Sequence, residues 1–204
     1  MAKRTSKKSQ SKSSQPADAV QMLKADHKQV RKFFEQFYDA PDNDKGSIAG
    51  KLFIELDIHS KLEEELFYPA VQSQLESFGR GNGLDVTDDG EGGTVEDAEL
   101  TFDPIDGAEL EAIDDDDDAS EVISTAYESH RTVHDLIQQL RSLDPKSDDY
   151  RELFTELEEA VIEHVAEEED VILPLAAAQL DVQTLGIKMQ RRRDDLRSQS
   201  SLAA

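Results

Sequence analysis

The chain contains no cysteine and no tryptophan among its 204 residues. The absence of thiols excludes disulfides, thiolate metal sites, iron–sulfur clusters and cysteine nucleophiles. Any metal held by this protein must therefore be held by imidazole nitrogen and carboxylate oxygen. Basic residues are scarce as well, since 22 lysines and arginines stand against 46 aspartates and glutamates, for a formal net charge of −24. Such a charge repels phosphate and argues against nucleic acid or an anionic membrane as a partner.

Long apolar runs are also missing. No stretch approaches the roughly 20 consecutive apolar residues that a transmembrane helix needs. Residues 1–15 are basic and serine-rich, without the apolar segment of a secretory signal or the apolar face of a transit peptide. The sequence predicts a disordered tail over residues 1–15 of a soluble, cytoplasmic protein.

Four segments show the three- and four-residue spacing of apolar positions that is typical of amphipathic helices. We expect helices at about 16–40, 47–78, 119–143 and 147–179. No segment alternates apolar and polar residues in the manner of a strand. The sequence therefore predicts an all-α protein.

Residues 79–119, between the second and third expected helices, are rich in glycine and aspartate. They hold too few apolar side chains to offset the entropy lost on ordering, which predicts a flexible acidic insertion. The stretch "DVTDDG" lacks the ligand spacing of a calcium loop. A halophilic or partner-binding role for the acidic residues stays open.

The C-terminal tail, residues 181–204, has a weak helical pattern in Leu185, Met189 and Leu196. Its arginines alternate with Asp194 and Asp195, which disfavours a nucleic-acid patch. We expect a partly helical, solvated tail.

The chain contains an internal repeat. "HSKLEEELFYP" at His59–Pro69 is nearly repeated by "HVAEEEDVILP" at His164–Pro174, and "DHKQV" at Asp26–Val30 resembles "SHRTV" at Ser129–Val133. The chain therefore consists of two similar helix pairs. Two amphipathic pairs can bury their apolar stripes against each other, which predicts an antiparallel up-down-up-down four-helix bundle over residues 16–180.

All five histidines are expected on the inward stripes of the four helices. Burying several imidazoles and two carboxylates without a charge partner would cost several kcal/mol per group, and a cation at their centre removes that cost. His59 with Glu63, and His164 with Glu168, are spaced so that both side chains leave one helix face. The neighbouring acids are expected to be solvated or to support the ligands. The predicted metal ligands are His27, His59, Glu63, His130, His134, His164 and Glu168.

This order of motifs on four helices resembles the hemerythrin family in its bacterial form, the HHE cation-binding domain. The resemblance covers residues 16–180 and implies a non-haem di-iron centre, bridged by two carboxylates, with chemistry toward dioxygen, peroxide or nitric oxide. Two features depart from the family. Oxygen-carrying hemerythrins place the last carboxylate one residue later, which here would choose Glu169 over Glu168, and the acidic insertion is long.

The two halves differ beside the first histidine of each. His134 lies one turn beyond His130, whereas Arg31 lies one turn beyond His27. We expect one ion to receive three imidazoles and the ion at His27 and His59 to receive two. The second ion would then keep an open coordination position, the mark of a reactive site.

Imidazole and carboxylate suit iron, zinc, manganese or copper, and the resemblance favours two iron ions. We expect a protein that binds or senses dioxygen or a related small ligand. The alternatives are an enzyme that reduces peroxide or nitric oxide, with Tyr127 as its candidate proton donor, and an iron-storage protein. Storage is less favoured because a ferritin-like site would be richer in carboxylates. A metal- and oxygen-binding role is favoured over a dedicated enzyme, and no protein partner can be predicted.

Overall fold

A computed structural model describes residues 18–81 and 116–202, so the basic N-terminal tail and most of the acidic insertion lie outside the described residues. The first half of the chain forms α1 (Ala19–Asp39), α2 (Asp42–Leu62), η1 (Glu63–Phe67) and α3 (Tyr68–Gly81). The second half forms α4 (Asp116–Leu140), α5 (Asp148–Glu167), η2 (Glu168–Ile172), α6 (Leu173–Gln179) and α7 (Val182–Leu202). No strand occurs in either described range.

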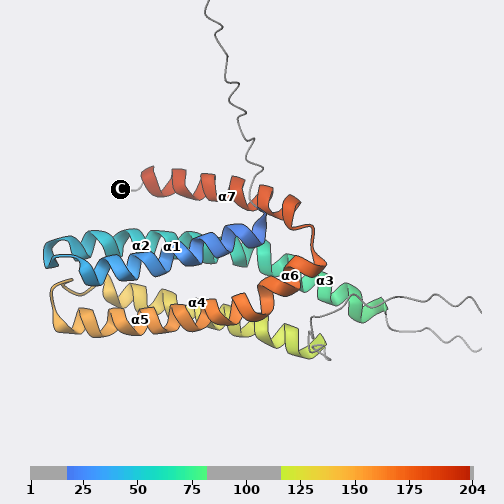
Figure 1. Ribbon diagram of the computed structural model, residues 1–204, viewed down its shortest axis with the longest axis horizontal. Helices are drawn as coiled ribbons and strands as arrows, with labels where there is room; N and C mark the ends of the chain where they lie inside the picture. The colour runs from blue at the N-terminus through green and yellow to red at the C-terminus, as the bar shows by residue number, and fades with distance from the viewer. Residues whose placement is uncertain (1–17, 82–115, 203–204) are drawn as a thin grey trace, which may run out of the picture.

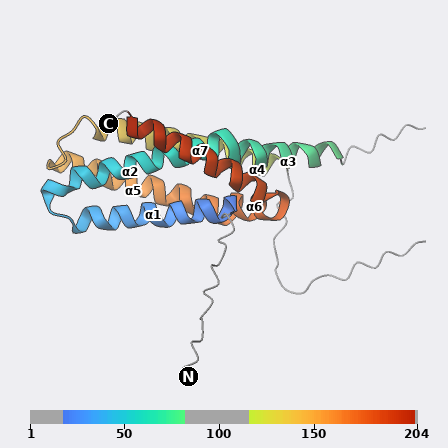
Figure 2. The same ribbon diagram turned by 90° about the horizontal axis from the view of Figure 1, so that it is seen from above.

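The α1–α2 hairpin and the α4–α5 hairpin lie side by side and form the predicted all-helical bundle (Figures 1 and 2). Side-chain caps mark two of the helix starts, where Asp18 accepts a hydrogen bond of 2.8 Å from the Gln21 amide and Ser147 one of 3.1 Å from the Tyr150 amide. None of the described helices carries an apolar stretch long enough to cross a bilayer. The fold expected from the repeat is therefore confirmed.

The apolar core consists of two clusters. Near the α1–α2 turn, Phe37 stacks on Phe154 with ring centroids 3.7 Å apart. Leu23 and Phe67 belong to the other cluster, toward α3 and α6. The helices run continuously from one cluster to the other, and four of the predicted ligand histidines lie on them where the two clusters meet.

Both long returning helices, α2 and α5, end in a single π-helical turn. These turns are η1 and η2, and each begins at a predicted ligand, Glu63 or Glu168. A π turn places one extra residue in the helical turn, and such turns are frequent at functional sites. In each turn the first glutamate faces the bundle interior, and the next one, Glu64 or Glu169, lies at its margin.

The prediction of a solvated C-terminal tail was wrong. Helix α7 packs across α1 and α2 (Figure 1), and it buries Leu185, Met189 and Leu196. These three residues have the helical spacing noted in the sequence. The charged residues between them suggested a solvent-exposed helix, which is why their burial was not predicted. Those charges form ion pairs with the bundle, such as Arg192 with Glu65.

Candidate metal centre

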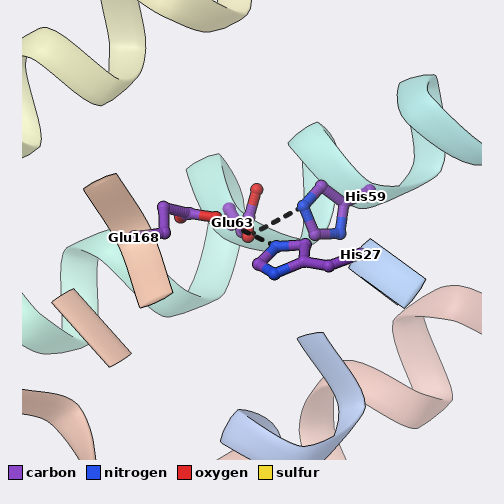
Figure 3. Close-up of side chains that lie close together, drawn as sticks. All are labelled: His27, His59, Glu63 and Glu168. Atoms are coloured by element: carbon purple, nitrogen blue, oxygen red, sulfur yellow. Dashed lines mark ion pairs between the residues drawn. The ribbon is translucent and has the colours of Figure 1, made fainter. Parts of the chain in front are cut away.

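Six of the seven predicted ligands meet inside the bundle, and each is at most 5% exposed. The four helices of the two hairpins and the two π turns each supply one residue. The six are His27 on α1, His59 on α2, Glu63 on η1, His130 on α4, His164 on α5 and Glu168 on η2. Figure 3 shows four of them, with Glu63 and Glu168 turned toward the rings of His27 and His59.

The ligand atoms form two groups that share Glu63. His27, His59, Glu63 and Glu168 make one group; Glu63, His130 and His164 make the other, and within each group the atoms lie within 4.8 Å of one another. Oε1 of Glu63 lies 3.1 Å from Nε2 of His59, and its Oε2 lies 3.2 Å from Nε2 of His130. One carboxylate thus presents an oxygen to each half of the bundle, which is the arrangement of a bridging ligand between two ions.

The inward atoms are suited to a cation. Nε2 of His27 and His59, both oxygens of Glu63 and Oε2 of Glu168 are buried without a hydrogen-bond partner. Unpartnered buried polar atoms are costly, and five of them facing one centre need a common partner. Two positive ions bound by imidazole and carboxylate would provide it.

Three of the four buried imidazoles are held from behind by a carboxylate. Nδ1 of His27 lies 2.9 Å from Glu169, and Nδ1 of His130 lies 2.9 Å from Glu64. In both cases the glutamate belongs to the opposite hairpin and directly follows a ligand glutamate. A carboxylate behind a metal-binding imidazole fixes the ring and strengthens it as a donor.

His59 and His164 differ in what holds the outer nitrogen of the ring. Nδ1 of His59 lies 3.5 Å from Asp26, which is also bound by Arg193 of α7. Nδ1 of His164 is buried and has no hydrogen-bond partner. The His27–His59 group is therefore fully supported, while the His130–His164 group is supported on one side.

The whole arrangement agrees with a known family. The model of the hemerythrin HHE cation-binding domain matches residues 18–88 and 96–176. The chain belongs to this family. Among curated proteins, none matches the sequence significantly. The crystal structure of a hemerythrin HHE cation-binding domain-containing protein from Mycobacterium kansasii is similar in fold, with a TM-score of 0.64, 20% identity and coverage of 91% of each chain.

The imidazoles of His130 and His164 differ in pKa. Although burial alone would lower the pKa of His130, its contacts with the Glu63 and Glu64 carboxylates raise it to about 9. Burial lowers the pKa of His164 to about 3. The Nε2 atoms of these two rings are 3.0 Å apart, so protonated His130 donates to neutral His164. This shared proton links the two imidazoles of the His130–His164 group.

The two buried carboxylates also differ. Burial and repulsion from Glu168 raise the pKa of Glu63. Burial would raise the pKa of Glu168 too, but its contacts with His27 and the other imidazoles lower it. A positive ion beside Glu63 would remove this disparity.

His134 does not join the cluster. Its side chain is 61% exposed, and its Nδ1 lies 3.8 Å from Asp135. The buried stripe of α4 continues from His130 to Val133 and Ile137, and a residue one position past Val133 faces solvent. The prediction that His134 points inward was therefore wrong, and with it the expected excess of imidazoles on that side. Each group now has two imidazoles, and the remaining difference lies in Glu168, whose Oε2 is 3.2 Å from Nε2 of His27 and 3.6 Å from Nε2 of His164.

Tyr68 is a site residue that the sequence prediction missed. Its side chain is fully buried and donates a hydrogen bond of 2.7 Å to Glu168, with the hydroxyl 3.4 Å from Nε2 of His130. Tyr127, the candidate from the sequence, is half-buried and instead packs its ring against Tyr68. The repeat contained a signal for Tyr68, since it places a polar hydroxyl at the position where the second half has the apolar Leu173.

A groove leads from the surface toward the His130 side of the centre. It has a volume of about 340 Å³, lies between α2 and α4, and reaches the His130 ring. Four of its lining residues also line a cavity of about 10 Å³ beside the four histidine rings. The shared residues are Leu56, Ser60, His130 and Val133. These four residues therefore border both the groove and the cavity.

Proposed function

We propose that this HHE cation-binding domain holds two iron ions and binds dioxygen or a related small ligand. The observation that carries the proposal is the pair of ligand groups sharing Glu63, which suits two ions at close spacing. Imidazole and carboxylate donors without thiolate suit iron, and the family resemblance favours it over zinc or manganese. When bound, an iron pair supplies two electrons for exchange with one diatomic ligand.

The chain's own residues favour ligand binding on the His130–His164 side. Glu168 lies nearer to His27 than to His164, so the His130–His164 group leaves more of the coordination shell to an external ligand. The groove reaches this side, and the buried side chains of Val133, Val161 and Val165 line the small cavity beside it. An apolar lining limits water around the site and leaves room for a small uncharged ligand.

The test is anaerobic reconstitution with iron(II), followed by measurement of iron per chain. We expect about two ions, one for each of the two ligand groups. Azide or dioxygen added to the loaded protein should then produce a charge-transfer absorption band that saturates at one ligand per iron pair. Iron near zero contradicts the metal assignment, and two ions without any spectral response contradict the ligand-binding role.

A second function is reduction of peroxide or nitric oxide, and one observation favours it. Such a reaction consumes protons, and the buried Tyr68 hydroxyl can supply one because it is hydrogen-bonded to Glu168 at the edge of the centre. Under this hypothesis, Tyr68→Phe should reduce peroxide turnover at least about tenfold, the low end of a general-acid contribution. Its iron content and azide binding should remain unchanged. Tyr127→Phe is the matched control, because it alters the neighbouring ring without touching Glu168.

If the wild-type protein turns over neither peroxide nor nitric oxide, the enzyme function is excluded and the binding function stands. Iron storage receives no support from the cluster, which contains two carboxylates among its six residues.

A further inference from the structure

Arg193 on α7 is a buried charge at an unusual place. It is 8% exposed, and α7 begins at Val182, beyond residue 176 where the family match ends. Burying a guanidinium is costly unless a carboxylate pairs with it. Asp26 on α1 is that partner.

Asp26 connects α7 to the metal centre. Its Oδ2 is the atom bound by Nη2 of Arg193, and the same oxygen lies 3.5 Å from Nδ1 of His59. A single oxygen thus links a helix outside the family match to a ligand imidazole.

The second half of the molecule lacks an equivalent of this link. The position equivalent to Asp26 is Ser129, and Nδ1 of His164 has no hydrogen-bond partner. Helix α7 packs against α1, α2 and η1, all in the first half. The carboxylate behind His59 therefore occurs in the half that α7 covers.

We propose that Arg193 is a positioning residue that strengthens metal binding by the His27–His59 group. It holds the Asp26 side chain against His59, which fixes the imidazole ring and makes its inward nitrogen a better donor. The proposal rests on the proposed metal centre. The simpler role for α7 is to cover apolar side chains of α1 and α2, and the experiment must separate the two.

The experiment measures iron(II) release from the fully loaded protein to a chromogenic chelator, with one phase expected for each ion. Arg193→Met keeps most of the apolar bulk and removes the charge, and it should speed the slower phase about 10- to 100-fold, the usual effect of losing such a partner. The faster phase, from the His130–His164 group, should not change. Arg193→Lys should recover part of the loss.

Arg197→Met is the matched control. Arg197 lies one turn further along α7 and pairs with Glu55 at 2.9 Å, but the two side chains are 50% and 31% exposed. We expect wild-type release from this variant. In an Asp26→Ser background, Arg193→Met should have no further effect on the slow phase, because the two residues act through one contact.

Each outcome decides the matter. Equal effects of Arg193→Met and Arg197→Met, faster release in both phases, or a full Arg193→Met effect in the Asp26→Ser background would overturn the positioning role. Helicity by circular dichroism identifies a variant that has lost α7, and Asp26→Ser alone must then reproduce the selective loss. A wild-type protein that binds no iron contradicts the proposed function itself. If the wild-type protein binds two ions and Arg193→Met releases them at the wild-type rates, only this inference is contradicted.

Discussion

The two halves of the bundle supply the same ligands and different surroundings. Four pairs of residues correspond, namely His27 with His130, His59 with His164, Glu63 with Glu168, and Glu64 with Glu169. In each half the first glutamate of the pair faces the centre and the second holds a histidine of the other half. What is common to the halves is therefore the set of candidate metal ligands and the carboxylates that hold them.

The halves differ in the residues that contact the candidate ligands. The first half has Asp26 and Tyr68 where the second has Ser129 and Leu173, and α7 packs against α1, α2 and η1 of the first half. Asp26 supports the His27–His59 group, whereas Tyr68 reaches across to Glu168 and His130. We infer that the halves have divided the work, with one ion held firmly and the other placed for a ligand.

The largest expected effect comes from the one residue that both ligand groups share. Glu63→Ala should reduce iron from about two ions per chain to near zero, because each group loses an anionic oxygen at once. Elemental analysis after reconstitution measures it. Glu168→Ala should spare more metal, since the three-residue group contains Glu63 and not Glu168. Equal losses in the two variants would show that the carboxylates bridge equally.

Ser129→Asp should make the halves more alike. The new carboxylate would stand where Asp26 stands in the first half and could accept a hydrogen bond from Nδ1 of His164, which now has no partner. We expect iron in the weaker site to be released about tenfold more slowly, the low end of the effect of such a partner. Ser124→Asp, at an exposed position on the same helix, is the control. Faster release would mean that an unpaired charge there does more harm than the hydrogen bond does good.

The metal-free protein should lose stability on both sides of about pH 6.5. The pKa of His130 is raised from 6.5 to about 9, so its contribution is present below pH 6.5 and is lost as the pH rises toward 9. The pKa of His164 is lowered from 6.5 to about 3, so its contribution is present above pH 6.5 and is lost as the pH falls toward 3. Each group changes the free energy of unfolding by at most about 1.4 kcal/mol per pH unit.

Urea unfolding in chelator from pH 5 to pH 9 measures this dependence. His130→Gln should flatten the alkaline side. A midpoint that rises steadily from pH 6.5 to pH 9 would contradict the shared proton between His130 and His164.

The smallest effect is expected at His134. Because its side chain is 61% exposed and lies outside both ligand groups, His134→Ala should leave iron content and release rates within error of wild type. The variant also tests the asymmetry that the sequence suggested. Loss of iron from one site would restore His134 as a ligand and require α4 to turn when metal binds.

The sequence was sufficient to predict the bundle and the six clustered residues, because periodicity and the repeat constrain the same positions. It failed at His134, since a step of three and a step of four from His130 are both helical, and only packing shows that Val133 takes the inward place. Tyr68 was missed because a π turn shifts the residues after Glu63 relative to an ordinary helical stripe. The packing of α7 was missed because its apolar residues are few and its charges find partners only in three dimensions.

The exchange of glutamates between hairpins bears on how this chain arose. Neither hairpin completes its own site, because the carboxylate behind His27 comes from the second hairpin and the one behind His130 comes from the first. Such reciprocal contacts are what a two-fold symmetric pair of identical hairpins would make. We infer that a half-length chain with this sequence pattern would form the same cluster as a homodimer. Only a chain that joins both copies can place Asp26 in one half and Ser129 in the other, because a symmetric dimer must carry the same residue at both positions.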